Sequence, residues 1–203
     1  MVNTQIKRDI YLERLIRRRH NGRIKIVTGV RRSGKTYLLF NLFSLWLKGN
    51  GVDNSHIIQI NLEDRRNKAL RDPDALLEYI DSKIQGEAMH YVMIDEIQHV
   101  PEFEDVLNSY LNMNNADVYV TGSNAKFLSK DVITTFRGRG DEVRIYPLSF
   151  GEFHSAVNRT KEEDWAEYML YGGLPQTVFM DSAEEKVTFL KGVYEETYLR
   201  DIK

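Results

Sequence analysis

The chain has 203 residues, of which 42% are hydrophobic and 29% are charged, and its formal net charge at pH 7 is −2. This length suffices for one large domain, alone or with a small appendage. No apolar run reaches the ~20 residues that a membrane-spanning helix needs, and the start MVNTQIKRD is not a signal peptide. Because cysteine is absent, disulfides, thiol nucleophiles and cysteine zinc sites are excluded. The expected class is a soluble cytoplasmic protein without a membrane partner.

Positive charge gathers at the beginning of the chain. The first 40 residues contain eleven lysines and arginines but only two acids, Asp9 and Glu13. A basic end of this kind can bind nucleic acid or other anionic phosphates. Alternatively, the run RRRH at 17–20 ends a helix, where cations are favourable beside the C-terminal dipole.

Strands and helices are predicted to alternate up to residue 148. The first helix ends at Asn21-Gly22, and a later one begins with Pro73 after the cap Asp72. In chain order, the expected elements are a helix at 8–22, a strand at 23–29, a helix at 35–51, a strand at 56–62, a helix at 72–86, a strand at 90–96, a helix at 101–113, and strands at 117–123 and 141–148. This alternation, with several unbroken apolar strands, predicts an α/β fold with a parallel sheet covered on both faces.

After residue 148 the strand signals stop and helix starts follow. Each start is a Ser or Thr three residues before a Glu, a capping box: Ser149/Glu152, Thr160/Glu163 and Ser182/Glu185. We therefore divide the chain into a core at 1–148 and a helical lid at 149–203. The last helix carries an apolar stripe and reaches Lys203 without a C-cap, which favours a piece of a longer protein over a frayed natural end.

The stretch GVRRSGKT at 29–36 fits the phosphate-loop pattern G-x-x-x-x-G-K-[ST], with a predicted strand before it and a helix after it. Its glycines let backbone N–H groups turn inward around phosphates at a helix N-terminus. Lys35 is expected to place its charge on the β- and γ-phosphates, and the Thr36 hydroxyl to bind Mg²⁺. The predicted ATP-binding residues are Gly29, Val30, Arg31, Arg32, Ser33, Gly34, Lys35, Thr36 and Tyr37.

Two acids end the apolar strand YVMIDE, at the sheet edge where the phosphate loop also opens. Asp95 is predicted to hold the Mg²⁺ shell, and Glu96 to polarise an attacking water. A base for water favours hydrolysis over transfer to a metabolite. The alternative for an acidic pair at a strand end is a helix cap.

Two further segments supply candidate catalytic side chains. At the end of the strand VYVTGSN, a hydroxyl or amide can orient the lytic water, with Ser123 as first choice before Thr121 and Asn124; the alternative is a plain turn. In FRGRG, Arg139 is preferred to Arg137 as an arginine that neutralises transition-state charge, in its own chain or from a neighbouring subunit. Here the alternative is a solvated turn.

Together these motifs resemble a prokaryotic AAA+ family, the archaeal-type ATPases related to the STAND clade. The resemblance is carried by TGVRRSGKTYLL, YVMIDEIQ, VYVTGSNAKFLS, FRGRGDEVRIYPLSFGEF, YGGLPQ and YEETYLRDI, spread over residues 23–202. It implies a P-loop NTPase core with five strands in the order 5-1-4-3-2, followed by a helical lid. By analogy with the clade's glycine-x-proline element, Gly173 and Pro175 are expected near the adenine. A further C-terminal domain, winged-helix or nuclease-like, is also implied.

Paired arginines are a common variant of this family's loop, so they do not disqualify the site. The side chains of Arg31 and Arg32 are expected either to contact a neighbouring subunit or partner, or to be solvated.

The favoured function is Mg²⁺-dependent ATP hydrolysis that couples nucleotide state to a protein or DNA partner through the lid and the C-terminal region. A transition-state arginine from a neighbour would require a homo-oligomer. Alternatives are an ATP-binding switch with little hydrolysis, a nucleic-acid motor that uses the basic first 40 residues, and a small-molecule kinase. The run DEIQ resembles a helicase pattern, but no basic groove with stacking aromatic residues accompanies it.

Overall fold

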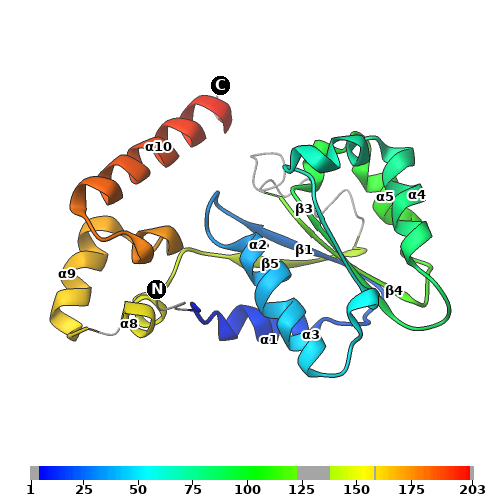
Figure 1. The fold of residues 1–203 in the computed structure, drawn as a ribbon, viewed down its shortest axis with the longest axis horizontal. Coiled ribbons are helices and arrows are strands. Elements are labelled where there is room, and N and C mark those ends of the chain that lie inside the picture. Colours follow the sequence, from blue (N-terminus) through cyan, green and yellow to red (C-terminus); the bar gives the residue numbers. More distant parts are fainter. Residues whose placement is uncertain (1–4, 123–137, 158, 202–203) are drawn as a thin grey trace.

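The computed structural model describes residues 5–122, 138–157 and 159–201 (Figure 1). Within these ranges, five parallel strands form one sheet in the order β2-β3-β4-β1-β5, which confirms the predicted fold class and strand order. The strands are β1 Ile24–Gly29, β2 Ile57–Asn61, β3 His90–Asp95, β4 Ala116–Thr121 and β5 Gly140–Ile145. Parallel pairing brings their C-terminal ends to one edge of the sheet.

Helices lie on both faces of the sheet and at one end of it (Figure 1). The α-helices are α1 Asp9–Arg17, α2 Lys35–Tyr37, α3 Ser44–Gly49, α4 Pro73–Lys83, α5 Phe103–Ser109, α8 Phe150–Val157, α9 Lys161–Tyr171 and α10 Ala183–Asp201. A π-helical segment, Leu38–Phe43, joins α2 to α3, so that residues 35–49 are continuously helical as predicted.

Each face of the sheet has its own hydrophobic layer, because side chains alternate along a strand. On one face, Ile24 and Ile26 of β1 pack in the cluster that contains the apolar residues of α4 and α5. On the other face, Val27 packs with the helical residues that follow the phosphate loop and with Leu15 of α1. This double cover explains why β1 and β3 are buried along their whole length.

Some predicted boundaries are wrong for local reasons. The helix expected at 101–113 is shorter: α5 starts at Phe103, after Glu102 with a φ of 51°, and turns follow Ser109. The strand expected at 141–148 ends at Ile145, and Pro147 has no N–H to continue a ladder. Short 3₁₀ segments were not predicted at all; they are Asn54–His56, Arg65–Arg71, Ile97–His99 and Pro175–Phe179.

Helices α8, α9 and α10 form a separate layer beyond the sheet, at the left of Figure 1. All three predicted capping boxes are present: the Ser149, Thr160 and Ser182 side chains accept hydrogen bonds from backbone N–H groups three residues on. Leu148 and Phe153 pack with Ile6 of the N-terminal segment in a small core of their own. Among the described residues, no helix combines the length and apolar character that crossing a membrane requires.

Candidate functional site

The phosphate loop connects the end of β1 to α2. Gly29 lies so close to β5 that a Cβ there would be 2.4 Å from the backbone oxygen of Ile145. Gly34 has a φ of 95°, a left-handed conformation that favours glycine, and the helix begins directly after it. Arg32, in the middle of the loop, also has a positive φ of 63°. The loop therefore wraps around the N-terminus of the 35–49 helix, an arrangement suited to phosphates.

Lys35 is almost buried, with 5% of its surface exposed. Its ammonium group lies 3.2 Å from the backbone oxygen of Gly29 and 3.3 Å from that of Val30, so the side chain bends back over the loop. Burial lowers the pKa of Lys35, while the carboxylates of Glu96 and Asp95 act in the opposite direction. A cation with so little access to water gains strongly from an anionic ligand.

Asp95 is held at the end of β3 by two threonines. The Thr36 hydroxyl lies 2.9 Å from both carboxylate oxygens, and the Thr121 hydroxyl donates to Oδ1 over 2.6 Å. Burial raises the pKa of Asp95, although these two hydrogen bonds oppose the rise. The strand order explains the contact, because β4 lies between β3 and β1 and carries Thr121 at its end. The structure thus brings together both predicted Mg²⁺ ligands.

Glu96 follows Asp95 in a left-handed conformation, with a φ of 56°. Its backbone N–H donates to the Thr121 hydroxyl over 2.9 Å, and the Gln98 side-chain amide donates to its carboxylate. Such a conformation costs free energy in a non-glycine residue and is typical of functional sites. Here it turns the chain sharply out of the strand, and Glu96 keeps 8% of its surface exposed.

A cavity of about 330 Å³ lies over the phosphate loop, beside Glu96 at the end of β3. Lys35, Thr36 and Glu96 line it, as do the loop arginines Arg31 and Arg32. Two lining residues were not predicted, Glu63 and Gln176. Glu63 follows β2 at the same edge as the acids, so its position along the strand gave a usable signal.

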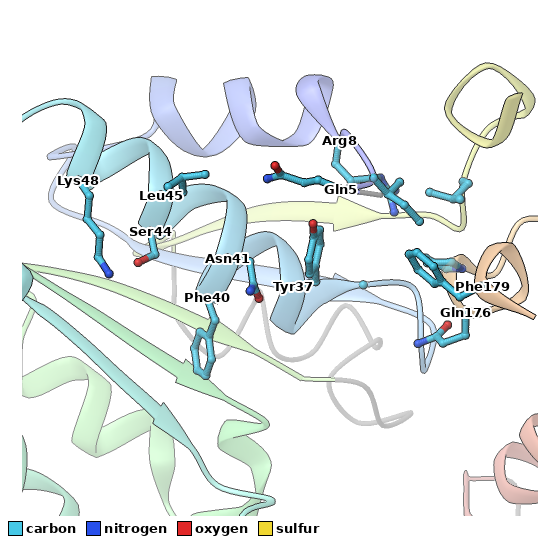
Figure 2. Close-up of a pocket in the computed structure, with 14 residues that line it drawn as sticks. Gln5, Arg8, Tyr37, Phe40, Asn41, Ser44, Leu45, Lys48, Gln176 and Phe179 are labelled. Atoms are coloured by element: carbon cyan, nitrogen blue, oxygen red, sulfur yellow. The ribbon is translucent and has the colours of Figure 1, made fainter. Parts of the chain in front are cut away.

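A second cavity, of about 580 Å³, adjoins the first (Figure 2). Gly34, Tyr37 and Gln176 line both cavities. The second one is more apolar: its walls include Phe179 of the lid and Ile6 of the N-terminal segment. Figure 2 shows Tyr37, Gln176 and Phe179 gathered at the end nearest the phosphate loop.

The two residues expected near an adenine lie differently. Pro175 lines the larger cavity. Gly173 is not among its lining residues; it packs against Leu148, whose N–H donates to the Gly173 oxygen over 2.7 Å. A Cβ at Gly173 would be 2.2 Å from the Leu148 oxygen, so this glycine allows two backbone segments to approach closely.

Arg8 ties the loop to the lid and was missed from the sequence. It is 3% exposed, and its guanidinium donates to the Ser33 oxygen (3.0 Å), the Tyr146 oxygen (2.6 Å) and the Glu152 carboxylate (3.0 Å). These partners lie 25 to 144 residues away along the chain. In the sequence, Arg8 is one cation in a basic segment, with no signal of this role.

Arg139 is not at the cavities of its own chain. It is exposed just before β5, and its backbone oxygen accepts from the Ile24 N–H over 3.0 Å at the first residue of β1. The phosphate loop lies at the other end of β1, and a strand of this length spans about 17 Å. Ser123, Asn124 and Arg137 lie outside the described residues.

Arginines of the basic N-terminal segment have partners within the fold. Helix α1 ends at Arg17, as expected if the run RRRH marks a helix end. Arg18 pairs with Asp141 over 2.8 Å, and Arg19 stacks on Trp46 with its guanidinium carbon 4.3 Å from the ring centre. The segment therefore has local structural partners, which weakens the case for a nucleic-acid motor.

Comparison with known proteins agrees with this geometry. A sequence profile for the AAA domain matches residues 21–154, which contain the phosphate loop, both acids and all five strands. An uncharacterized protein of Haemophilus influenzae is 35% identical over 208 residues, covering 100% of this chain and 52% of the relative. An uncharacterized protein of Methanocaldococcus jannaschii is 30% identical over 211 residues, covering 97% and 44%. The chain thus spans about half the length of these relatives.

Among solved structures, the chain is similar to the Walker-type ATPase PABY2304 of Pyrococcus abyssi. The TM-score is 0.62 at 16% sequence identity, and the match covers 86% of this chain and 65% of the other. At this identity the similarity concerns the fold alone. The matched profile covers more than half of the chain, including the loop and the strands that position the acids, and the chain therefore belongs to the AAA domain family, whose fold is that of P-loop ATPases.

Proposed function

We propose that the chain binds ATP with Mg²⁺ and hydrolyses it, and that the lid passes the nucleotide state to a protein or DNA partner. The observation that carries the proposal is the single hydrogen-bonded unit of Thr36, Asp95, Thr121 and Glu96 beside Lys35. The two adjoining cavities suit the two ends of a nucleotide, with charged groups around one and apolar walls around the other.

The hydroxyl of Thr36 and the carboxylate of Asp95 would hold Mg²⁺. Hard oxygen donors fit this ion, which commonly takes only one or two protein oxygens and completes its shell with phosphate and water. The direct Thr36–Asp95 contact brings the two donors together. When bound, the ion would neutralise charge on the phosphates.

The remaining steps belong to the side chains of the chain itself. Lys35 binds and stabilises the phosphate charge, which compensates its own poor solvation. Glu96 accepts a proton from the attacking water, and Gln98 orients its carboxylate. Arg139 can contribute only to the site of a neighbouring subunit, because it lies at the far edge of its own sheet.

The deciding experiment is phosphate release from Mg-ATP, measured against protein concentration for the wild type and Glu96→Gln. Loss of the base should lower the rate by roughly 10²–10⁴-fold while ATP binding persists. Glu63→Gln is the matched control, since it removes an acid from the same cavity without touching the β3 end. Glu63→Gln should lower the rate of phosphate release far less than Glu96→Gln.

The dependence of specific activity on protein concentration tests the role of Arg139. If specific activity rises with concentration and Arg139→Ala abolishes the rise, a neighbour's arginine completes the site. Tight ATP binding without phosphate release, with the same result for the wild type and Glu96→Gln, would contradict hydrolysis and favour an ATP-binding switch.

A further inference from the structure

The far end of α10 returns to the phosphate loop. The Glu196 carboxylate lies 3.2 Å from Nε of Arg31 and 3.6 Å from Nη2 of Arg32. The Arg32 guanidinium also lies 5.2 Å from the ring centre of Phe189, about two helical turns before Glu196 on α10. Glu196 of the lid thus contacts both arginines of the loop, and the Phe189 ring lies beside Arg32.

The same arginines line the cavity of about 330 Å³ over the loop. A nucleotide phosphate in that cavity and the Glu196 carboxylate would therefore compete for the same two cations. The existing contact is easy to exchange: the three side chains are 30–38% exposed. Neither Arg32 Nε nor Glu196 Oε2 has a hydrogen-bond partner among the described residues, so the pairing is electrostatic rather than directional.

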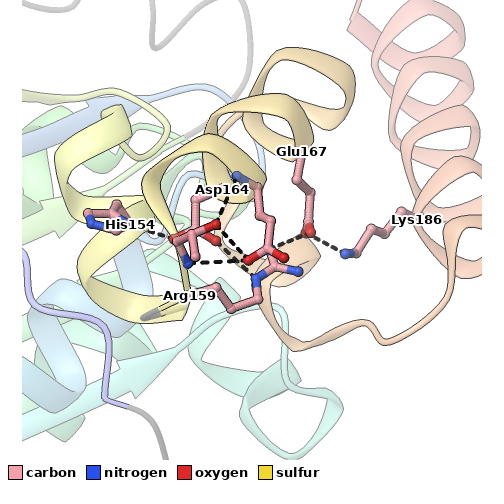
Figure 3. Close-up of polar contacts among 7 residues, drawn as sticks. His154, Arg159, Asp164, Glu167 and Lys186 are labelled. Carbon is pink, nitrogen blue, oxygen red and sulfur yellow. Dashed lines mark hydrogen bonds and ion pairs between the residues drawn. The ribbon is translucent and has the colours of Figure 1, made fainter.

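The other end of α10 is fastened. Lys186, in its first turn, is 7% exposed and donates to the Glu167 carboxylate of α9 over 2.5 Å (Figure 3). Glu196 lies ten residues further on, about 15 Å along the helix axis. The helix is therefore anchored near its start and contacts the loop through a half-exposed pair near its end.

We propose that Glu196 is a positioning residue that holds Arg31 and Arg32 until nucleotide binds, and that bound nucleotide displaces it and releases the end of α10 from the loop. This inference rests on the nucleotide site proposed above. It assigns the loop arginines a function within their own chain: they exchange a carboxylate of the lid for a phosphate. Because coupling is reciprocal, removing the carboxylate must strengthen nucleotide binding.

The first test is the affinity for a fluorescent, non-hydrolysable ATP analogue. Glu196→Gln should bind it roughly two- to fivefold more tightly than the wild type, the range that half-exposed ion pairs supply, and the gain should shrink at high salt. Glu195→Gln, an exposed neighbour on the same helix, is the charge-matched control and should not change the affinity. Equal affinity of the wild type and both variants would overturn the inference.

A double-mutant cycle distinguishes direct pairing of Glu196 with the two arginines from a general effect of its negative charge. In an Arg31→Gln/Arg32→Gln background, Glu196→Gln should no longer change the affinity, because its partners are gone. A gain that persists in that background would mean that Glu196 acts only as a nearby negative charge, which contradicts the inference.

The movement of α10 has its own readout. Because the chain lacks cysteine, spin labels can be placed at Asn50→Cys and Lys191→Cys alone, both exposed positions. Adding the analogue should shift the distance distribution, and Glu196→Gln without nucleotide should already resemble the bound state. Unchanged distances with nucleotide bound would overturn the inference, whereas a wild type that binds no nucleotide at all would overturn the proposed function beneath it.

Discussion

The Thr121 hydroxyl links the two acids of the site. It is fully buried, donates to the Asp95 carboxylate and accepts from the Glu96 N–H. Both acids are therefore fixed by a side chain on the neighbouring strand. A buried hydroxyl in this position is a positioning group for the two residues that would hold the metal and activate the water.

We expect Thr121→Val to keep the shape of the site and remove both hydrogen bonds. Loss of the hydroxyl that accepts from the Glu96 N–H should cost about 1–3 kcal/mol of unfolding free energy. Loss of support for Asp95 should lower phosphate release by about 10–100-fold. Denaturant unfolding and steady-state release measure the two effects. Thr121→Ser retains the hydroxyl and should restore most of both; failure of this rescue would assign the effect to packing instead.

At the scale of elements, β1 and β4 are joined by charge as well as by their ladder. Lys25 is completely buried in the layer beneath α1 and pairs with Asp117, which also accepts from the Tyr119 hydroxyl over 2.8 Å. Burial raises the pKa of Tyr119, with the Asp117 charge adding to the effect, so the phenol stays a donor. This network lies far from the phosphate loop, at the start of both strands.

We expect Asp117→Ala to destabilise the fold by about 3–5 kcal/mol, because it leaves the Lys25 charge buried without compensation. Replacing both partners, as in Lys25→Met/Asp117→Leu, should recover most of the loss. Denaturant midpoints for the single and double variants decide the matter. If the single variant were as stable as the wild type, water would have to reach Lys25.

The lid is held by a second ionic cluster (Figure 3). Asp164 of α9 is fully buried and accepts from His154 of α8 over 2.6 Å and from Arg159 over 3.0 Å. Burial alone would raise the pKa of Asp164, but these hydrogen bonds outweigh it and hold the pKa below its usual value. The pKa of Glu167 is lowered too, against its burial, by Lys186 and Arg159.

This cluster predicts how the stability of the lid depends on pH. A carboxyl whose pKa is lower in the folded state contributes stability above its unfolded pKa of about 3.9, and that stability is lost as the pH falls through the lower folded value. The difference in melting temperature between wild type and Asp164→Asn should therefore be constant near neutrality and shrink below about pH 4. Melting curves between pH 7 and pH 3 test this. A difference that grows on acidification would contradict the assigned direction.

At the scale of the whole molecule, the sequence predicted those features whose residues lie close together along the chain. The alternating strands predicted the sheet. The loop pattern and the strand-end acids predicted that Thr36 and Asp95 belong to one site, and the structure has them in contact. The structure also bears out each of the three capping boxes of the lid, since their partners are three residues apart.

Contacts between distant segments were not predictable in this way. Arg8 and Glu196 look like ordinary surface charges in the sequence, and only folding brings them to the loop from opposite ends of the chain. Their partners lie far away in the sequence, so no spacing between neighbouring residues could predict these contacts. Arg139 is the opposite case. Its motif suggested a catalytic side chain, but it precedes β5 and therefore lies at the end of the sheet away from the phosphate loop.

The position of Arg139 has a consequence for symmetry. If Arg139 acts on a neighbouring subunit, as proposed above, the acid at one end of the strands and the arginine at the other would give each subunit two different contact surfaces. Such an interface is heterologous: the surface that offers the arginine cannot also be the one that receives it. A two-fold dimer would not form it, and repetition of the contact leads to a closed ring or an open helical filament. With Arg139 in that role, every subunit in a closed ring would have a complete site, and in a filament the subunit at one end would lack an arginine.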